Sequence, residues 1–375
     1  METKQTEAGP PSAPPDERPD NPLPRAVMRP TNVFKLLDGE WKFALDPEDI
    51  GLNQRWYLGR EYERTAVWPG SVEAHMEGAK EEAKEQQQQG PHWQDKVVVW
   101  YEREFPLPER GDAQPPKLLQ LTFGACGYET RVWLNGRVLR TIEGEKVHYG
   151  EYTSFSYELP EEHLRLFNRL TVRIADTMDA EIPRGKQQSH VYKRGGIWYQ
   201  TYTGAVRSVW IETVERNRLR SRVGAVSVVE DRLVRFDFTT LIHDPGVYTL
   251  RLKAFERGAA GDSEPLAESD YVLRLTAGEK RQRVVLEVPG ARLWSPSEAN
   301  LYRLVAQLID ADGHAAQIET HFGLRKVEAR GRYVYLNNKP LYLDGILYQP
   351  GTATYDEMRR HMVSMKWLGC NLVRV

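Results

Sequence analysis

The stretch that most constrains the fold of this chain is the last one, residues 333–375. Apolar Tyr333–Leu336 is followed by Asn337-Asn338, with a turn expected at Lys339-Pro340. The run Leu341–Leu347 comes next and has the length and composition of a buried strand. This order predicts a short hairpin followed by a buried strand.

A helix is expected after this strand. Thr354 stands at the N-cap position, and Glu357 follows at the capping-box spacing. Apolar residues then recur three and four positions apart, which predicts one buried helical face. These residues are Met358, Met362, Met365 and Leu368. Gly369 ends the helix, and Asn371–Val375 begins a second apolar strand, so Cys370 is expected at the start of a buried strand.

Strand, helix and strand make one βαβ unit, in which the two strands run parallel. Parallel strands need neighbouring strands and cover on both faces of the sheet. One βαβ unit cannot provide them. We therefore expect this chain to be the front part of a larger protein, cut off shortly after a domain has begun.

Composition excludes several classes of protein. The chain has 375 residues, enough for two or three domains, and its 51 Lys and Arg nearly balance its 53 Asp and Glu. No basic excess is present to bind nucleic acid. The two cysteines, Cys126 and Cys370, do not form a disulfide framework or a metal-ligand pair, and neither a metal nor a cofactor is expected. No run approaches the ~20 apolar residues of a membrane helix. The polar, Pro-rich N-terminus lacks the apolar core of a signal peptide, so a cytoplasmic location is expected.

Two β-rich regions follow a polar tail. Residues 1–30 are rich in Pro and charge, which predicts disorder. From Phe34 to Val214, short alternating runs predict an antiparallel sandwich, with hairpin turns at Asp38-Gly39 and Asn135-Gly136. Four indole rings at alternating strand positions are expected to fill its core. They are Trp41, Trp100, Trp133 and Trp210.

A second series of runs, from Arg218 to Gly323, predicts an immunoglobulin-like sandwich, with a turn at Asp312-Gly313. The charged, Gln-rich segment Glu77–Gln89 interrupts the first region. We interpret it as a solvated surface segment rather than a docking helix.

Motifs along the chain resemble those of family 2 glycoside hydrolases, a family that includes β-galactosidases, β-glucuronidases and β-mannosidases. The terminal strand–helix–strand unit is similar to the start of the family's (β/α)8 barrel. Each motif alone is a weak indicator, but their shared order over residues 31–375 is a strong one. The other motifs are Leu37–Phe43, Trp68–Val72, Trp100–Phe105, Val132–Gly136, Gly150–Phe155, Gly196–Gln200, Trp294–Pro296 and His321–Arg325.

The resemblance implies a mainly β chain in four segments. Residues 1–30 are the tail, residues 31–216 a sugar-binding-like jelly-roll sandwich similar to galactose-binding domains, residues 217–326 the immunoglobulin-like sandwich, and residues 327–375 the incomplete start of a TIM barrel. It also implies a β-galactosidase-like O-glycosyl hydrolase that retains the anomeric configuration by means of two Glu residues. In the family these Glu residues lie on later barrel strands. No catalytic residue is therefore assigned in this chain, which we expect to be inactive alone.

Substrate contacts are expected where the first barrel strand ends, because the active site of such barrels lies on the C-terminal face. Tyr348 and Gln349 stand there, either as substrate contacts or in loop packing. The best-known family members have Asn-Arg-His at Leu347-Tyr348-Gln349, so galactosidase specificity does not follow. A loop of the first domain, Asp179–Tyr192, is the other candidate. Its candidate sugar-binding residues are Lys186, Gln187 and His190.

A non-catalytic carbohydrate-binding or interaction protein made of two sandwiches is the alternative. The βαβ end argues against it, because a finished binding protein would leave apolar strand edges exposed there. Under the hydrolase hypothesis the expected partner is a carbohydrate, a β-glycoside, and homo-oligomers are common in the family.

Overall fold

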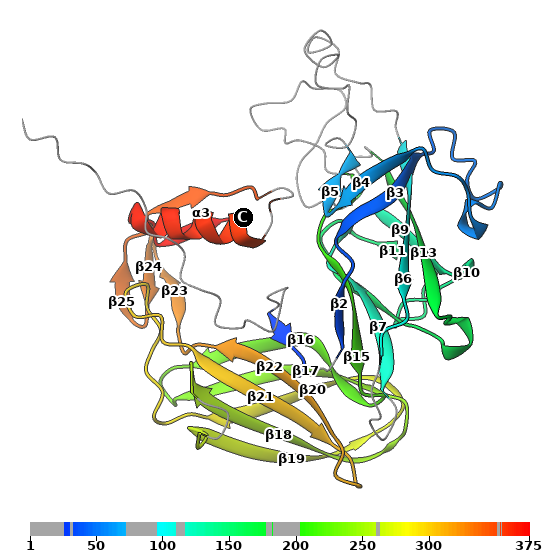
Figure 1. Cartoon of the computed structure of the whole chain (residues 1–375). Coiled ribbons are helices and arrows are strands. Elements are labelled where there is room, and N and C mark those ends of the chain that lie inside the picture. Colours follow the sequence, from blue (N-terminus) through cyan, green and yellow to red (C-terminus); the bar gives the residue numbers. More distant parts are fainter. Residues whose placement is uncertain are drawn as a thin grey trace, which may run out of the picture. The chain divides into compact units, whose positions relative to one another are not determined.

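The computed structural model describes residues 26–30, 33–72, 96–109, 117–177, 182, 203–259, 263–350, 353 and 355–375. They form two compact units, each described here by itself (Figure 1). We call Thr31–Val214 the first unit, and Met1–Pro30 with Glu215–Val375 the second unit. Strands dominate both units, which confirms the mainly β fold class.

The first unit is a sandwich of two antiparallel sheets. The larger sheet is 7-stranded, in the order β10-β9-β13-β6-β3-β4 with β11 paired to β9, and the other is 4-stranded, in the order β12-β7-β15-β2. The larger sheet comprises β3 (Gly39–Leu45), β4 (Arg64–Trp68), β6 (Lys96–Pro106), β9 (Glu129–Leu134), β10 (Arg137–Val138), β11 (His148–Tyr149) and β13 (Phe167–Thr177). The smaller comprises β2 (Phe34–Leu36), β7 (Leu118–Phe123), β12 (Phe155–Glu158) and β15 (Val209–Val214).

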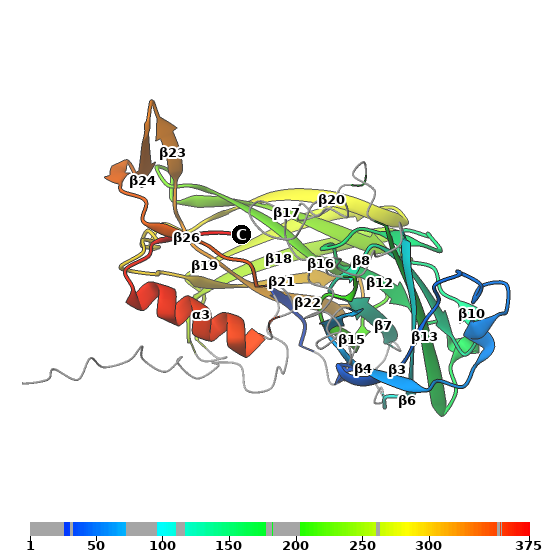
Figure 2. The same ribbon diagram turned by 90° about the horizontal axis from the view of Figure 1, so that it is seen from above.

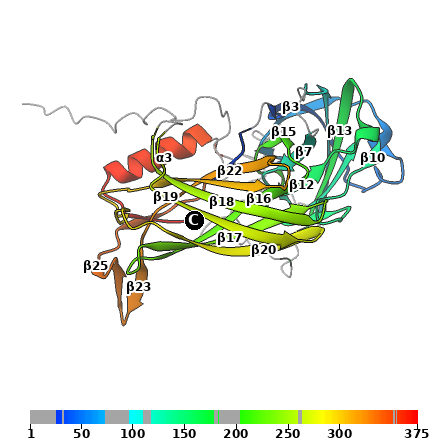
Figure 3. The ribbon, with the colours of Figure 1, turned by 90° about the horizontal axis from the view of Figure 1, so that it is seen from below.

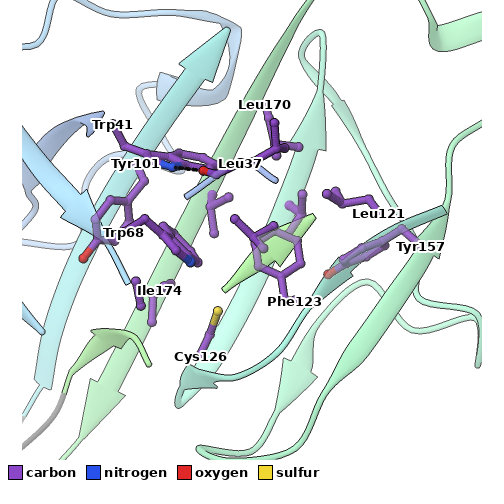
Figure 4. Close-up of a cluster of buried hydrophobic side chains, with 14 of the residues drawn as sticks. Leu37, Trp41, Trp68, Tyr101, Leu121, Phe123, Cys126, Tyr157, Leu170 and Ile174 are labelled. Carbon is purple, nitrogen blue, oxygen red and sulfur yellow. Dashed lines mark hydrogen bonds between the residues drawn. The ribbon is translucent and has the colours of Figure 1, made fainter. Parts of the chain in front are cut away.

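The core of the first unit lies between these sheets, where alternate side chains of each strand point inward. Figure 4 shows Trp41, Trp68 and Phe123 among the buried rings, with the Trp41 Nε1–H donating to the Leu37 carbonyl at 2.8 Å. Cys126 is fully buried beside them. Burial raises the pKa of the Cys126 thiol, so the sulfur remains protonated and unreactive.

Of the two predicted hairpin turns, one is confirmed and one is wrong. Asn135-Gly136 joins β9 to β10, and both residues have positive φ, as a tight hairpin requires. Asp38-Gly39 instead carries the chain from the smaller sheet to the larger one, because β2 and β3 belong to different sheets. Arg103 holds this corner: its Nη1 donates to the carbonyls of Leu37 and Asp38, both at 2.9 Å.

The tryptophan expectation is right about burial and wrong about the face for three of the four rings. Trp41 lies in the core cluster. Trp100 is buried on the opposite face of the larger sheet, because its strand neighbour Tyr101 takes the core position. Trp133 lies on that same face and stacks on Trp100 with ring centroids 5.3 Å apart. By the same alternation Trp210 is buried outside the core, beside Ile211.

A connection between β3 and β4 covers the outer face of the larger sheet. Asp46 anchors it: one carboxylate oxygen accepts from Ile50 N, and the other from Gly51 N and Trp100 Nε1, all at 2.9 Å. Tyr57 then stacks on Trp133 with its plane within 6° of parallel. This cover is what buries aromatic and charged side chains outside the sandwich core.

The second unit contains another sandwich, drawn as two layers in Figure 3. One sheet is 5-stranded, in the order β1-β22-β21-β18-β19, and the other is 3-stranded, in the order β16-β17-β20. The first comprises β1 (Val27–Met28), β18 (Gly246–Glu256), β19 (Ala267–Leu275), β21 (Tyr302–Ile309) and β22 (Ala315–Phe322). The second comprises β16 (Arg218–Val228), β17 (Leu233–Ile242) and β20 (Gly278–Glu287). The turn at Asp312-Gly313 joins β21 to β22 as predicted.

Residues 26–30 are ordered, so the prediction of disorder up to residue 30 is wrong at its end. Val27 pairs with Thr320 on β22 and is buried in the core of the second unit. Arg29 is also buried, and its Nη2 donates to the Leu219 carbonyl at 2.5 Å and to Ser221 Oγ at 3.2 Å. This short segment therefore joins the edges of the two sheets.

Beyond the sandwich, β23 (Val327–Arg330), β24 (Tyr333–Leu336) and β25 (Lys339–Leu341) form a 3-stranded sheet. The hairpin turn lies at Asn337 and Asn338, which have φ of 51° and 66°, and not at Lys339-Pro340 as predicted. Lys339 and Pro340 instead begin β25, because two residues in the left-handed region complete the turn. No helix among the described residues is long and apolar enough to cross a membrane.

Candidate functional site

The predicted strand–helix–strand unit is present at the end of the chain. It comprises β26 (Gly345–Leu347), α3 (Tyr355–Trp367) and β27 (Leu372–Arg374). The two strands are parallel, with Gly345 opposite Leu372 and Leu347 opposite Arg374. Figure 2 shows α3 beside β26 within the second unit.

The starts of both strands are fixed by Asn371. Its Oδ1 accepts from Asp344 N at 3.0 Å, and its Nδ2 donates to the Tyr342 carbonyl at 2.8 Å. Gly345 lets the strands approach, because a Cβ at this position would lie 2.8 Å from Leu372 Cβ and 2.9 Å from its carbonyl oxygen. These contacts set the register that brings the strand ends to one edge.

Two expectations about burial here are wrong. β26 and Leu372 are exposed, and α3 has no buried residue. Met362 in α3 is 37% exposed, and Leu368, which follows the helix, is 65% exposed. Cys370, expected to open a buried strand, is half-buried. The physical reason is that a two-stranded sheet covers too little of a helix to bury a full stripe of side chains. Thr354, the expected N-cap residue, lies outside the described residues.

Tyr348 continues the ladder after β26, since its N–H donates to the Arg374 carbonyl at 2.8 Å. Its half-buried side chain turns toward α3, where its hydroxyl and His361 Nδ1 are 2.8 Å apart. The two rings meet edge to face with centroids 5.7 Å apart. Tyr348 therefore ties the strand end to the helix.

Side chains on the other face of this sheet point away from α3. Successive residues of a strand point to opposite faces, so the Leu347 side chain points to the face away from Tyr348. Arg374 is paired with Leu347, so its side chain lies on the same face as that of Leu347. Arg374 is exposed, and half-buried Gln349 follows at the same edge. This edge offers a guanidinium and a carboxamide, two groups that bind sugar hydroxyls and carboxylates.

The sequence prediction placed Tyr348 and Gln349 at a strand end, where the structure has them. It missed His361 and Arg374. The register of the two strands was the signal for Arg374, because parallel strands end at one edge. The loop candidates Lys186, Gln187 and His190 lie outside the described residues, as do most of Asp179–Tyr192 and the segment Glu77–Gln89.

One group of side chains in the described part of the chain has the spacing of a metal site. It consists of Asp310, Asp312 and His314, whose candidate ligand atoms lie within 4.8 Å of one another. Asp310 Oδ1 accepts from the backbone N–H groups of Asp312 and His314, at 3.0 and 2.9 Å. These bonds account for the group as part of the β21–β22 turn.

Comparison with known proteins identifies relatives over most of the chain. Residues 225–325 match the family model described as glycosyl hydrolases family 2. The chain is 24% identical to a β-glucuronidase of Mus musculus over 370 residues, covering 92% of this chain and 53% of the relative. It is 25% identical to the β-glucuronidase of Homo sapiens over 379 residues, covering 92% and 54%.

Solved structures give the same result for the fold. A β-glucuronidase from Ruminococcus gnavus in complex with D-glucuronic acid superposes with a TM-score of 0.70 at 21% identity, covering 94% of this chain and 57% of that one. An apo structure of β-glucuronidase from the same organism also gives 0.70, at 20% identity, with 94% and 57% covered. The chain thus spans about half the length of the proteins it matches.

Proposed function

We propose, from the premise that this chain belongs to glycoside hydrolase family 2, that its whole protein cleaves β-glucuronides. The observation that carries the proposal is the similarity to proteins named β-glucuronidase over 92% of the chain. This choice of sugar differs from the β-galactosidase-like activity that the motifs led us to expect. The reaction would be a retaining hydrolysis of the O-glycosidic bond.

The described residues supply one edge of such a site. Arg374 is the group best suited to a uronic acid, because a guanidinium binds a carboxylate through two parallel hydrogen bonds. Gln349 offers both a donor and an acceptor for ring hydroxyls. Tyr348 keeps this edge in place through its bond to His361, so its role is positioning.

The two catalytic carboxylates of the retaining mechanism are proposed to lie in a region of the whole protein that this chain does not include. That region corresponds to the part of the relatives that the chain does not cover. A full barrel takes about 250 residues, and in such barrels the catalytic residues come from the ends of several strands. The structure describes β26 and β27 in this region of the chain. The chain alone should therefore release no 4-nitrophenol from 4-nitrophenyl β-D-glucuronide.

Two experiments test this proposal. Turnover by the purified 375-residue chain would show that its own residues suffice for catalysis. In a protein that carries this chain together with a complete barrel domain, the 4-nitrophenyl β-glucuronide should be hydrolysed in preference to the 4-nitrophenyl β-galactoside and β-mannoside. Arg374→Ala should remove much of the preference for glucuronide over glucoside, whereas Arg374→Lys should retain part of it. An unchanged preference in Arg374→Ala would assign the carboxylate to another group.

A further inference from the structure

The rings of Tyr128 and Tyr149 lie side by side on the first unit. Their centroids are 6.3 Å apart and their planes are tilted by 54°. Tyr149 is 60% exposed, and Tyr128 is half-buried. Five tryptophans of this unit are buried, so a sugar cannot stack on them: Trp41, Trp68, Trp100, Trp133 and Trp210. The Tyr149 ring, by contrast, is open to solvent.

Strand pairing places charged groups beside these rings. Tyr149 is paired with Glu129 across β11 and β9, so both side chains lie on the same face of the larger sheet. Arg131, two residues along β9, shares that face. Its Nε lies 3.4 Å from Glu129 Oε1, and the two side chains are 35% and 23% exposed.

A buried guanidinium holds these groups in place. Arg173 donates from Nη1 to Glu129 Oε1 at 2.9 Å and from Nη2 to Asp49 Oδ1 at 2.6 Å. Its side chain is 2% exposed, while the Asp49 side chain remains 31% exposed. Asp49 belongs to the connection that Asp46 anchors, so its position is fixed from a second direction. Glu129, which lies opposite Tyr149, and Asp49 are therefore both held by Arg173 before any ligand arrives.

This arrangement matches the chemistry of a pyranose. One face of a pyranose ring carries C–H groups that pack on an aromatic ring, and its edge carries hydroxyls that both donate and accept hydrogen bonds. Carboxylate oxygens accept from such hydroxyls and a guanidinium donates to them. A few fixed polar groups beside an apolar surface are what small-ligand sites present.

We propose that Tyr149 and Tyr128, together with Glu129, Arg131 and Asp49, form a carbohydrate-binding subsite on the first unit. Its ligand is a β-linked pyranose, which lies on the Tyr149 ring and directs its hydroxyls to the charged groups. The subsite holds sugar and has no part in bond cleavage. It rests on the proposed function only in the choice of a glucuronide as one of the probes.

The test measures binding by the purified chain, with no turnover involved. Saturation-transfer NMR is recorded with methyl β-D-glucuronide, methyl β-D-glucoside and cellobiose, followed by titration of whichever binds. One subsite of this size is expected to bind with a Kd of roughly 1 mM. Tyr149→Ala should raise that Kd about tenfold or more, while Tyr149→Phe, which keeps the ring, should change it by less than about threefold.

A matched control is Tyr333→Ala, because Tyr333 is 57% exposed and belongs to the second unit. This variant should bind as the unchanged chain does. The proposal is overturned if no probe shows saturation transfer, or if Tyr149→Ala binds with the original Kd, which would assign the sugar to other residues. Because no hydrolysis is measured, a protein without β-glucuronidase activity can still pass this test.

Discussion

Asp46 offers a quantitative test of how the outer face of the larger sheet is covered. Its side chain is 1% exposed, and its two oxygens accept three hydrogen bonds, from Ile50 N, Gly51 N and Trp100 Nε1. Asp46→Ala removes all three acceptor contacts and leaves three donors behind. A buried donor without a partner costs about 1–3 kcal/mol.

The expected loss follows from these contacts. Three unsatisfied donors cost at least about 3 kcal/mol in total. We expect a loss of about 3–5 kcal/mol rather than the upper end of the range, because water can reach some of these donors once the surface connection loosens. Asp46→Asn is the matched control. Its amide oxygen keeps one acceptor, but its NH₂ group faces a donor, so we expect about half of that loss.

The assay is urea unfolding followed by tryptophan fluorescence, since Trp100 lies at the site of change. The two units can unfold separately, so the transition of the first unit is analysed by itself. The midpoint should fall with little change in slope. A loss below about 1 kcal/mol for Asp46→Ala would refute the reasoning, because it would mean that the three donors find other partners.

Three further outcomes are expected. Gly345→Ala should speed amide exchange in β27, because its Cβ would lie 2.8 Å from the Leu372 Cβ, while the control Gly246→Ala, where the nearest atom is 3.6 Å away, should not. Arg29→Ala should lower the free energy of unfolding of the second unit by about 2 kcal/mol in urea. An unchanged midpoint would show that the contacts of residues 26–30 do not stabilise this unit. Burial lowers the pKa of His148, so the folded state binds this proton less tightly than the unfolded state. Its stabilising contribution is present above about pH 6.5 and is lost as the pH falls. A His148→Asn variant should have a Tm that falls less between pH 7.5 and 5, and equal falls would contradict this assignment.

Turn residues could be predicted from the sequence more readily than strand partners. Asn135-Gly136 joins two paired strands because its conformation alone brings the chain back on itself. Asp38-Gly39 has a similar composition, yet its flanking strands pair with distant strands in two different sheets. The pairing of β2 with β15 joins residues more than a hundred positions apart, as does the hydrogen bond from Val209 N to Asp38 Oδ1. No local pattern encodes them.

The candidate site shows the same division. The place of Tyr348 at a strand end followed from the order of apolar runs. Its partner His361 did not, because apolar periodicity says nothing about a polar contact between strand and helix. Val27-Met28 was hidden for another reason, since a strand of 2 residues is too short to show alternation. The expected core position of Trp133 failed because the pattern gives the period of a strand and not which face is inside.

The first unit is inserted into the sequence of the second unit, and Arg29 and Leu219, on either side of the insertion, contact each other. The backbone leaves the second unit at Pro30 and returns at Glu215, and the two crossing points flank residues that touch each other. A gene lacking codons 31–214, with a short Gly/Ser joint in their place, therefore keeps every strand of the second sandwich in its order. The first unit can in this sense be excised or exchanged as a cassette.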